Sequence, residues 1–195
     1  MRVGVTGIFA SGKGTVCEMF RAMGAEVIDT DILAREIVEP GGEGLARIVA
    51  EFGKEFLDGD GTLSRRRFAA HVFSDPGKVK ILNGITHPII LDLTLKRSSG
   101  GGIYMVNTPL LFEAGFDRHM DKNIVVVARS EQVVARGIER DGITAEEIKQ
   151  RLEHQIPLNE KMKMADYVID NSGAIENTRR QVIELWNTLK DMNNR

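Results

Sequence analysis

The sequence predicts an α/β fold in which a parallel β-sheet is flanked by helices. Short apolar runs, typical of buried parallel strands, alternate along the chain with segments whose apolar residues recur every three or four positions. This alternation favours a sheet that is covered on both faces and binds its ligands at the carboxyl ends of the strands. The 195 residues are enough for one well-buried core.

The composition is that of an ordinary globular protein and excludes several kinds of partner. Apolar residues make up 42% and charged residues 28% of the chain, with a formal net charge of -2 and a pI of about 6.1. We expect no nucleic-acid partner, because this balance gives no large basic face. No apolar run approaches the length of a membrane span, and the first residues contain no signal-peptide core. With Cys17 as its one cysteine, the chain is predicted to be cytoplasmic and without a membrane partner. A monomer or a small homo-oligomer is expected.

The N-terminal part is predicted to form strand, loop, helix and strand. Residues 3–7 have the pattern of a buried strand, and the apolar spacing turns helical from Lys13 to Met23. Gly24 is placed to end that helix as a C-terminal cap. Residues 25–31 then form a second short strand, which stops at Asp29 to Asp31.

A helical region with few strand signals follows, over about residues 32–97. Apolar residues at helical spacing are interrupted there by the glycine-rich turns 40–44 and 57–61. Pro88 is expected to end or to open a helix, since proline interrupts helical hydrogen bonding. We predict a helical insertion in the α/β core.

Strands and helices alternate again after the flexible loop 98–102. Three strands are predicted, the most apolar of which, 123–128, is expected to be central, and a closing helix contains Trp186. The other two strands cover residues 103–107 and 166–170.

Two helix starts are predicted in this second half. Ser130 is placed to cap a helix that runs to about Arg140. Thr144, with Glu147 three residues later, fits a capping box for the next helix.

The loop after the first strand has the spacing of a phosphate-binding loop. Gly7 and Gly12 are separated by four residues and precede Lys13, and the segment lies between a strand and a helix. Inward-facing backbone N–H groups and a helix N-terminus favour anions, and the lysine adds a mobile positive charge near the transferred phosphoryl group. The loop therefore indicates a nucleotide as a ligand and a P-loop NTPase-like fold. The alternative is a glycine-rich turn with an exposed lysine.

One position in the loop departs from the usual pattern. The residue after the lysine is usually a serine or threonine that binds Mg²⁺, but here it is Gly14, and Thr15 follows. Because the hydroxyl is displaced by one position, Thr15 is a candidate metal residue that would act through water rather than directly.

Asp29 and Asp31 lie where the second strand is predicted to end. Residues two apart on a strand point the same way, so one carboxylate could take a proton from an attacking hydroxyl while the other orients it or holds Mg²⁺ through water. The alternative for Asp31 is a helix N-cap, because a helical stretch follows it directly.

Arg136 and Arg140 lie four residues apart on one predicted helix face. The planar guanidinium group suits phosphate, and a mobile segment carrying such arginines would exclude water from a bound nucleotide. The alternative is a solvated face with ordinary ion pairs.

An ordered set of segments resembles the dephospho-CoA kinase family over about residues 1–185. The resemblance rests on their order along the chain, since the phosphate loop alone indicates only a nucleotide binder. It implies transfer of the γ-phosphoryl group of ATP, with Mg²⁺, to the ribose 3′-hydroxyl of dephospho-CoA. The segments are TGIFASGKGTV, VIDTDILAREIVEPG, DGTLSRRRFAAHVF, THPII, TPLLFE and ADYVIDNSG.

The same resemblance implies roles for individual residues. Asp31 matches the proposed base, and Lys13, Arg136 and Arg140 complete the implied catalytic set, the two arginines belonging to a lid. Asn171 matches the segment near the adenine of ATP. The implied ATP-phosphate residues are Ala10, Ser11, Gly12, Lys13, Gly14 and Thr15. The implied acceptor residues are Asp31, Arg65, His87, Pro109, Leu110 and Glu113.

The resemblance also implies an organisation of the chain. Residues 1–195 would form a single kinase unit with its core in 1–31, 98–138 and 160–195. Residues 32–97 would form the acceptor-binding insertion and residues 139–159 the lid.

The departures from the family pattern keep two other functions open. Ile8 and Ala10 stand where the family loop has glycines, and we expect a loop conformation that needs no positive φ at Ala10. A kinase acting on a nucleoside monophosphate or a sugar acid would share the loop and the lid. A nucleotide-binding switch without catalysis is the other alternative, motivated by Ala10 and Gly14.

Two further expectations concern charged residues outside these motifs. Glu113 lies in an apolar stretch, where a carboxylate belongs only if it is paired. Lys161 and Lys163 are expected to be a solvated pair.

Overall fold

The computed structural model describes residues 1–153 and 155–194. Its residues group into two units, one made of Met1–Ile28 and Ser98–Arg195 and the other of Asp29–Arg97.

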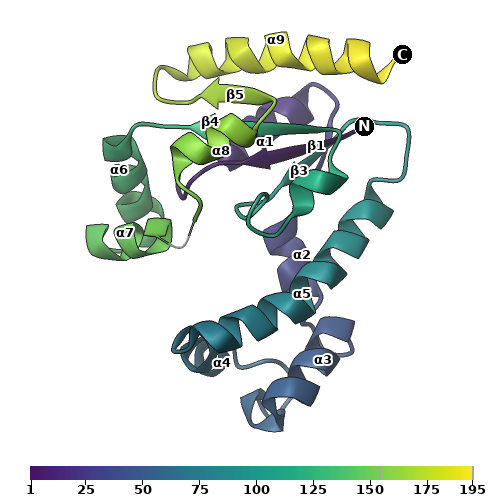
Figure 1. The fold of residues 1–195 in the computed structure, drawn as a ribbon, viewed down its shortest axis with the longest axis vertical. Coiled ribbons are helices and arrows are strands. Elements are labelled where there is room, and N and C mark those ends of the chain that lie inside the picture. Colours follow the sequence, from purple (N-terminus) through teal and green to yellow (C-terminus); the bar gives the residue numbers. More distant parts are fainter. Residues whose placement is uncertain (154, 195) are drawn as a thin grey trace. The chain divides into compact units, whose positions relative to one another are not determined.

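The first unit is built on a five-stranded sheet with the strand order β2-β3-β1-β4-β5 (Figure 1). The pairings of β1 with β3, β1 with β4 and β4 with β5 are parallel. The sequence therefore predicted the sheet correctly. The expectation of a central β4 is wrong, because β1, which is also buried, takes the middle position. The strands are β1 (Arg2–Thr6), β2 (Glu26–Asp29), β3 (Tyr104–Asn107), β4 (Lys122–Val127) and β5 (Tyr167–Asp170).

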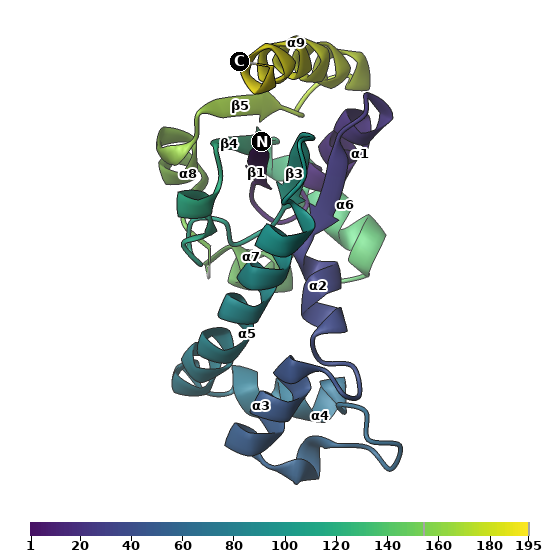
Figure 2. The same ribbon diagram turned by 90° about the vertical axis from the view of Figure 1, so that its right-hand side faces the viewer.

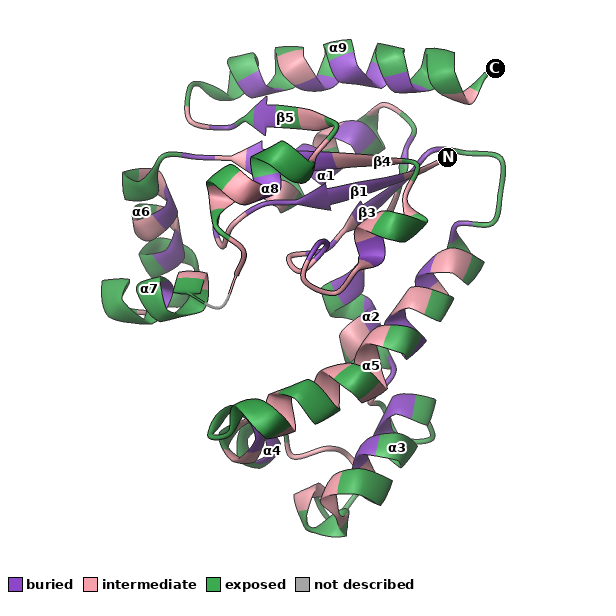
Figure 3. Cartoon of the chain, in the orientation of Figure 1, coloured by how far each residue is buried: buried purple, intermediate pink, exposed green. Residues whose placement is uncertain are grey.

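Helices cover this sheet on both sides, and Figure 2 shows α1 and α8 on opposite sides of it. The main core lies where α1 and α9 pack together and against the strands, and its residues include Phe20, Met105 and Trp186. Figure 3 shows that β1 is largely buried and that the inner side of α9 is buried. The helices are α1 (Lys13–Ala22), α6 (Ser130–Asp141), α7 (Ala145–Glu153), α8 (Leu158–Met164) and α9 (Ile175–Asn193), with a 3₁₀ turn η2 (Phe116–His119).

Two helix starts in this unit test the capping predictions. The capping box is confirmed, because the Thr144 backbone N–H donates to Glu147 Oε2 at 2.7 Å and the Glu147 backbone N–H donates to Thr144 Oγ1 at 3.2 Å. Ser130 does not cap α6. The N-cap position falls on Arg129, whose side chain makes no capping hydrogen bond, so Ser130 is already the first helical residue.

The second unit is helical and has its own small core. Ile48, Phe68 and Val72 are buried there, and the Phe52 and Phe68 rings meet edge to face with centroids 5.2 Å apart. The longest helix, α5, packs against each of α2, α3 and α4. The elements are α2 (Thr30–Glu36), α3 (Glu43–Phe52), η1 (Lys54–Phe56), α4 (Arg65–Phe73) and α5 (Pro76–Arg97).

Pro88 neither ends nor opens a helix, since it lies inside α5. A proline there lacks the N–H for one helical hydrogen bond, at a cost of about 3 kcal/mol. The packing of α5 against three neighbouring helices offsets this cost, and packing of this kind overrides local propensity. None of the described helices is both long and apolar enough to cross a membrane.

Candidate functional site

The phosphate loop joins β1 to α1 and has the conformation that its glycines predict. Gly12 has φ 93°, and a Cβ atom at this position would lie 2.1 Å from Asn171 Nδ2. Only glycine combines this backbone conformation with so close a neighbour. The Lys13 ammonium donates to the carbonyl oxygens of Gly7 and Ile8, both at 3.3 Å, so its side chain folds back over the loop.

Ala10 does not have the conformation that we expected. It has φ 55°, and it is the non-glycine residue with positive φ among those the structure describes. An L-residue in this left-handed region is strained by roughly 1–2 kcal/mol. The glycine of the usual loop is thus replaced by a residue that takes the glycine-like turn at a cost, and the expectation of a relaxed Ala10 is wrong.

Asn171 holds the loop in place from the carboxyl end of β5. Its side chain is buried, donating from Nδ2 to the Ser11 carbonyl oxygen at 2.9 Å and accepting from Thr178 Oγ1 at 3.0 Å. Its own carbonyl oxygen accepts from Arg136 Nη2 at 3.2 Å. Both ends of the Asn171 amide are therefore used within the protein. Sequence reasoning missed Thr178, which lies fully buried on the closing helix α9.

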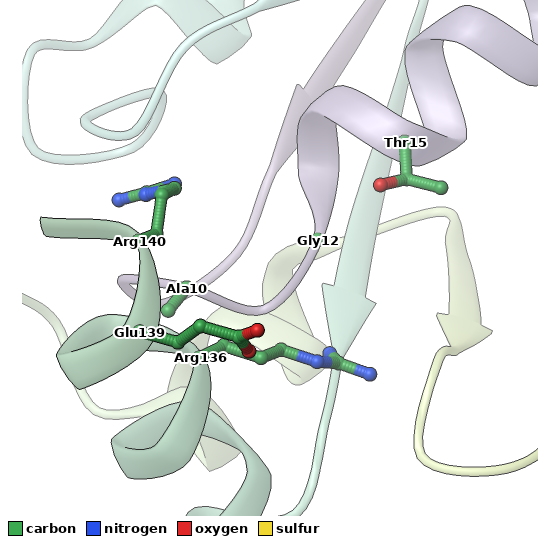
Figure 4. Close-up of a pocket in the computed structure, with 6 residues that line it drawn as sticks. All are labelled: Ala10, Gly12, Thr15, Arg136, Glu139 and Arg140. Atoms are coloured by element: carbon green, nitrogen blue, oxygen red, sulfur yellow. The ribbon is translucent and has the colours of Figure 1, made fainter.

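A pocket of about 370 Å³ opens beside the loop. Figure 4 shows the Arg136 side chain extending from α6 past Gly12. Arg136 Nη1 is buried and has no hydrogen-bond partner among the described residues. An unpaired guanidinium nitrogen beside such a loop suits an anion. Its lining residues are Ala10, Gly12, Thr15, Arg136, Glu139 and Arg140.

Arg140 also lines the pocket, but its guanidinium group is engaged elsewhere. Its Nε and Nη2 donate to the Asp141 carboxylate at 2.7 and 2.9 Å, and these bonds hold the pKa of Asp141 below its ordinary value. The Arg140 guanidinium carbon lies 5.2 Å from the centroid of the Phe9 ring, and that of Arg151 lies 5.1 Å from the same centroid. Phe9 also donates its backbone N–H to Gln155 Oε1 at 3.1 Å. Sequence reasoning missed these contacts to the phosphate loop.

The metal candidate lies at the start of α1. Thr15 is exposed and lines the pocket, and a Cβ atom at the neighbouring Gly14 would find nothing within 4 Å. Within the described ranges, no group of three or more His, Cys, Asp and Glu side chains could hold a metal ion.

The stretch after β3 is held by a buried ion pair. Lys161 Nζ, on α8, donates to the Pro109 carbonyl oxygen at 3.0 Å and lies 2.8 Å from Glu113 Oε1. Glu113 is therefore paired, as expected. The expectation of a solvated Lys161 is wrong, because its side chain is 0% exposed, whereas that of Lys163 is 70% exposed. Leu110, in the same stretch, is half-buried.

In the second unit the structure corrects the position of Asp31. β2 ends at Asp29, whose Oδ1 accepts from the backbone N–H groups of Asp31 at 2.8 Å and Ile32 at 3.4 Å. Asp29 is therefore the N-cap of α2, and Asp31 lies in the first turn of that helix. The strand position and the capping alternative for Asp31 are both wrong.

Two other predicted residues lie in the same unit. Arg65 begins α4, and its Nη2 lies 3.3 Å from Glu39 Oε1 in an exposed ion pair. His87 is half-buried on α5, and its burial lowers the pKa of the imidazole below its ordinary value.

The chain matches a family model described as "Dephospho-CoA kinase" over residues 1–177. Two similar curated proteins have the same description. That of Syntrophotalea carbinolica is 44% identical over 188 residues, which are 94% of this chain and 89% of the relative. That of Listeria monocytogenes serotype 4b is 40% identical over 186 residues, or 93% of each chain.

Solved structures are similar over nearly the whole chain. The dephospho-CoA kinase from Campylobacter jejuni is 28% identical with a TM-score of 0.73 and 98% of each chain covered. The structure of TT1252 from Thermus thermophilus is 34% identical with a TM-score of 0.83 and 97% of each chain covered. The shikimate kinase from Aquifex aeolicus, at 16% identity, a TM-score of 0.55 and 99% of each chain covered, shares the fold.

Proposed function

Since the chain belongs to the dephospho-CoA kinase family and phosphorylates dephospho-CoA to CoA, we propose that the pocket beside the phosphate loop binds the triphosphate of ATP. The observation that carries this proposal is the buried Arg136 Nη1, which has no partner among the described residues and lies at a pocket lined by the loop. Lys13 and the amides from Ser11 to Thr15 would share the remaining phosphate contacts. Arg140 would join them when the lid, residues 139–159, closes over the nucleotide.

Mg²⁺ would be held mainly through phosphate oxygens and water rather than by the protein. Mg²⁺ keeps several of its waters in kinase sites. The exposed Thr15 at the pocket, and the absence of a ligand cluster among the described residues, fit this kind of binding. When bound, the ion would neutralise charge on the β- and γ-phosphates. Thr15 would orient one of its waters.

Asp31 is the proposed base. Its carboxylate would accept the proton of the ribose 3′-hydroxyl as that oxygen attacks the γ-phosphorus in line and ADP leaves. The capping of α2 by Asp29 supports this role, because the cap is supplied by a different residue. Lys13, Arg136 and Arg140 would stabilise the charge on the transferred group.

The proposed acceptor residues come from two separate stretches of the chain. We assign Arg65 and His87 to the acceptor from residues 29–97, and Pro109, Leu110 and Glu113 from the stretch after β3. Burial keeps the His87 ring neutral near pH 7 by lowering its pKa, so this residue would contact the acceptor through hydrogen bonds rather than through charge.

We place the reaction in the cytoplasm. The chain contains one cysteine, the buried Cys17, which is compatible with a reducing compartment. The assembly is proposed to be a monomer or a small homo-oligomer, and sedimentation velocity would distinguish the two.

Asp31→Asn tests the proposed base directly. Turnover is expected to fall by roughly 10²-fold or more, because the amide cannot accept the proton, while ATP binding stays unchanged. The measurements are kcat for CoA formation and ATP affinity by calorimetry. Asp92→Asn is the matched control, since Asp92 belongs to the same unit and forms an exposed ion pair with Lys96. Equal kcat in the two variants would remove Asp31 from the mechanism.

A further inference from the structure

Lys161 is a charged residue in the protein interior, where removing a charge from water costs free energy. Its side chain is 0% exposed, and its partner Glu113 is only 17% exposed. Both side chains are less exposed than those of the pairs Lys122–Asp166 and Arg151–Asp141. Burying an ammonium and a carboxylate gives little net stability compared with apolar residues of the same size. The pair is better explained by the geometry that it imposes.

The Lys161 ammonium joins segments that are distant in sequence. The Pro109 carbonyl oxygen accepts from Lys161 and also from Thr6 Oγ1, at 3.2 Å, at the end of β1. Glu113 Oε1 accepts from Lys161 and also from the backbone N–H of Ile156, at 2.9 Å, just before α8. One buried cation therefore fixes both ends of the stretch 109–113.

The stretch 109–113 lies outside the sheet and is also held by local contacts. It follows β3 and makes no ladder hydrogen bonds with the sheet, since β3 ends at Asn107. Local backbone bonds such as Ala114 N–H to the Leu110 carbonyl oxygen, at 2.9 Å, close its turns, and Leu111 anchors it in the core. The Pro109 carbonyl and the Glu113 carboxylate are held instead by bonds from Thr6, Ile156 and Lys161, and Lys161 bonds to both groups.

We propose that Lys161 is a positioning residue that shapes the acceptor side of the site by fixing Pro109 and Glu113. This inference rests on the proposed function, in which residues 109–113 line the acceptor pocket. Lys161 touches neither substrate. It acts through the two groups that its ammonium holds.

Lys161→Met is the main test. Methionine has a similar length but no donor, so the Pro109 carbonyl loses a bond and Glu113 loses its countercharge. The KM for dephospho-CoA is expected to rise by about tenfold or more, because small displacements of positioning groups have large kinetic effects. The KM for ATP is expected to change by less than about twofold. Lys161→Arg, which can donate to both oxygens, is expected to restore most of the acceptor KM.

Lys163→Met is the matched control. Lys163 lies on the same helix and forms an exposed ion pair with Glu160, so its loss is expected to leave both KM values unchanged. Kinetic constants are measured below the melting temperature of the least stable variant. Each rate is divided by the concentration of folded protein in the sample. If Lys161→Met does not fold, Lys161→Gln, which keeps a shorter neutral donor, takes its place in the same comparison.

The outcomes separate this inference from the proposed function. Leu110→Ala removes a half-buried side chain of the stretch itself. If Leu110→Ala raises the acceptor KM and Lys161→Met does not, the positioning role is wrong while the acceptor assignment stands. If neither variant raises the acceptor KM, the assignment of residues 109–113 to the acceptor is wrong. The positioning role of Lys161, which depends on that assignment, is then wrong as well. Equal rises in both KM values of Lys161→Met would also overturn the inference, since they would indicate general loosening.

Discussion

Gly12 has the strictest requirement among the residues of the phosphate loop. Its φ of 93° and the closeness of Asn171 Nδ2 leave no room for a side chain. Gly14 has neither restriction, since it lies in the first turn of α1 with open space beside it. The backbone conformation and the close neighbour therefore require glycine at position 12, whereas neither restricts position 14.

Gly12→Ala is expected to lower the free energy of unfolding by about 2 kcal/mol, because the methyl group strains the backbone and displaces the bond from Asn171 to Ser11. The KM for ATP should rise as well. Chemical denaturation of Gly14→Ala is the control, and its stability is expected to rise by up to about 1 kcal/mol, since alanine favours helices. Equal stability of the two variants would contradict this account of the loop.

Spacing alone selected Gly12 and Lys13 as candidate site residues, because two glycines and a lysine between a strand and a helix have few other uses. Their role in binding ATP stays a prediction. The strain at Ala10 could not be predicted, since the sequence does not show that the loop keeps its turn when the glycine is lost. Asp31 was placed at a strand end, because a shift of one or two residues at an element boundary lies beyond what sequence patterns define.

At the level of elements, α5 shows that tertiary packing overrides the low helix propensity of a proline. The helix continues through Pro88 because its contacts with α2, α3 and α4 offset the lost hydrogen bond. It also carries His87, whose ring is partly withdrawn from water. The strands were predicted well because buried parallel strands have continuous apolar runs. The helix boundary expected at Pro88 was wrong, because tertiary contacts determine where α5 begins and ends.

The burial of His87 predicts a pH dependence of stability. Burial lowers the pKa of the folded imidazole below its ordinary 6.5, so the unfolded chain binds the proton more readily. This contribution to stability is present above about pH 6.5 and is lost as the pH falls below that value towards the folded pKa. In His87→Gln, unfolding free energies measured from pH 7 down to about pH 5 should fall less steeply than in the unchanged protein. Parallel curves would contradict the assignment.

At the level of the whole molecule, we expect the core around α1 and α9 to determine the stability of the first unit. Phe20 is fully buried, and its ring centroid lies 6.3 Å from that of Trp186, the single tryptophan of the chain. The amphipathic patterns predicted both helices. The sequence did not indicate that Lys161 would be buried against Glu113, because such a pair depends on which segments meet in the fold.

Phe20→Ala is expected to cost about 3–5 kcal/mol, since it leaves a cavity in this core. Denaturation can be followed by Trp186 fluorescence, whose emission should report the loosened contact. Phe73→Ala is the control, because Phe73 is 71% exposed and its loss should change stability by less than about 0.5 kcal/mol. Similar losses in both variants would show that this cluster does not determine stability.

The central claim is that the loop amides beside Lys13 hold the triphosphate and that Asp31 faces the alcohol that attacks it. A crystal structure with dephospho-CoA and a non-hydrolysable ATP analogue tests it most directly. We predict that the phosphates contact the amides of residues 11–15 and Arg136, and that the Asp31 carboxylate lies within hydrogen-bonding distance of the ribose 3′-hydroxyl. Phosphates bound away from this loop, or an Asp31 carboxylate directed away from that hydroxyl, would contradict the account.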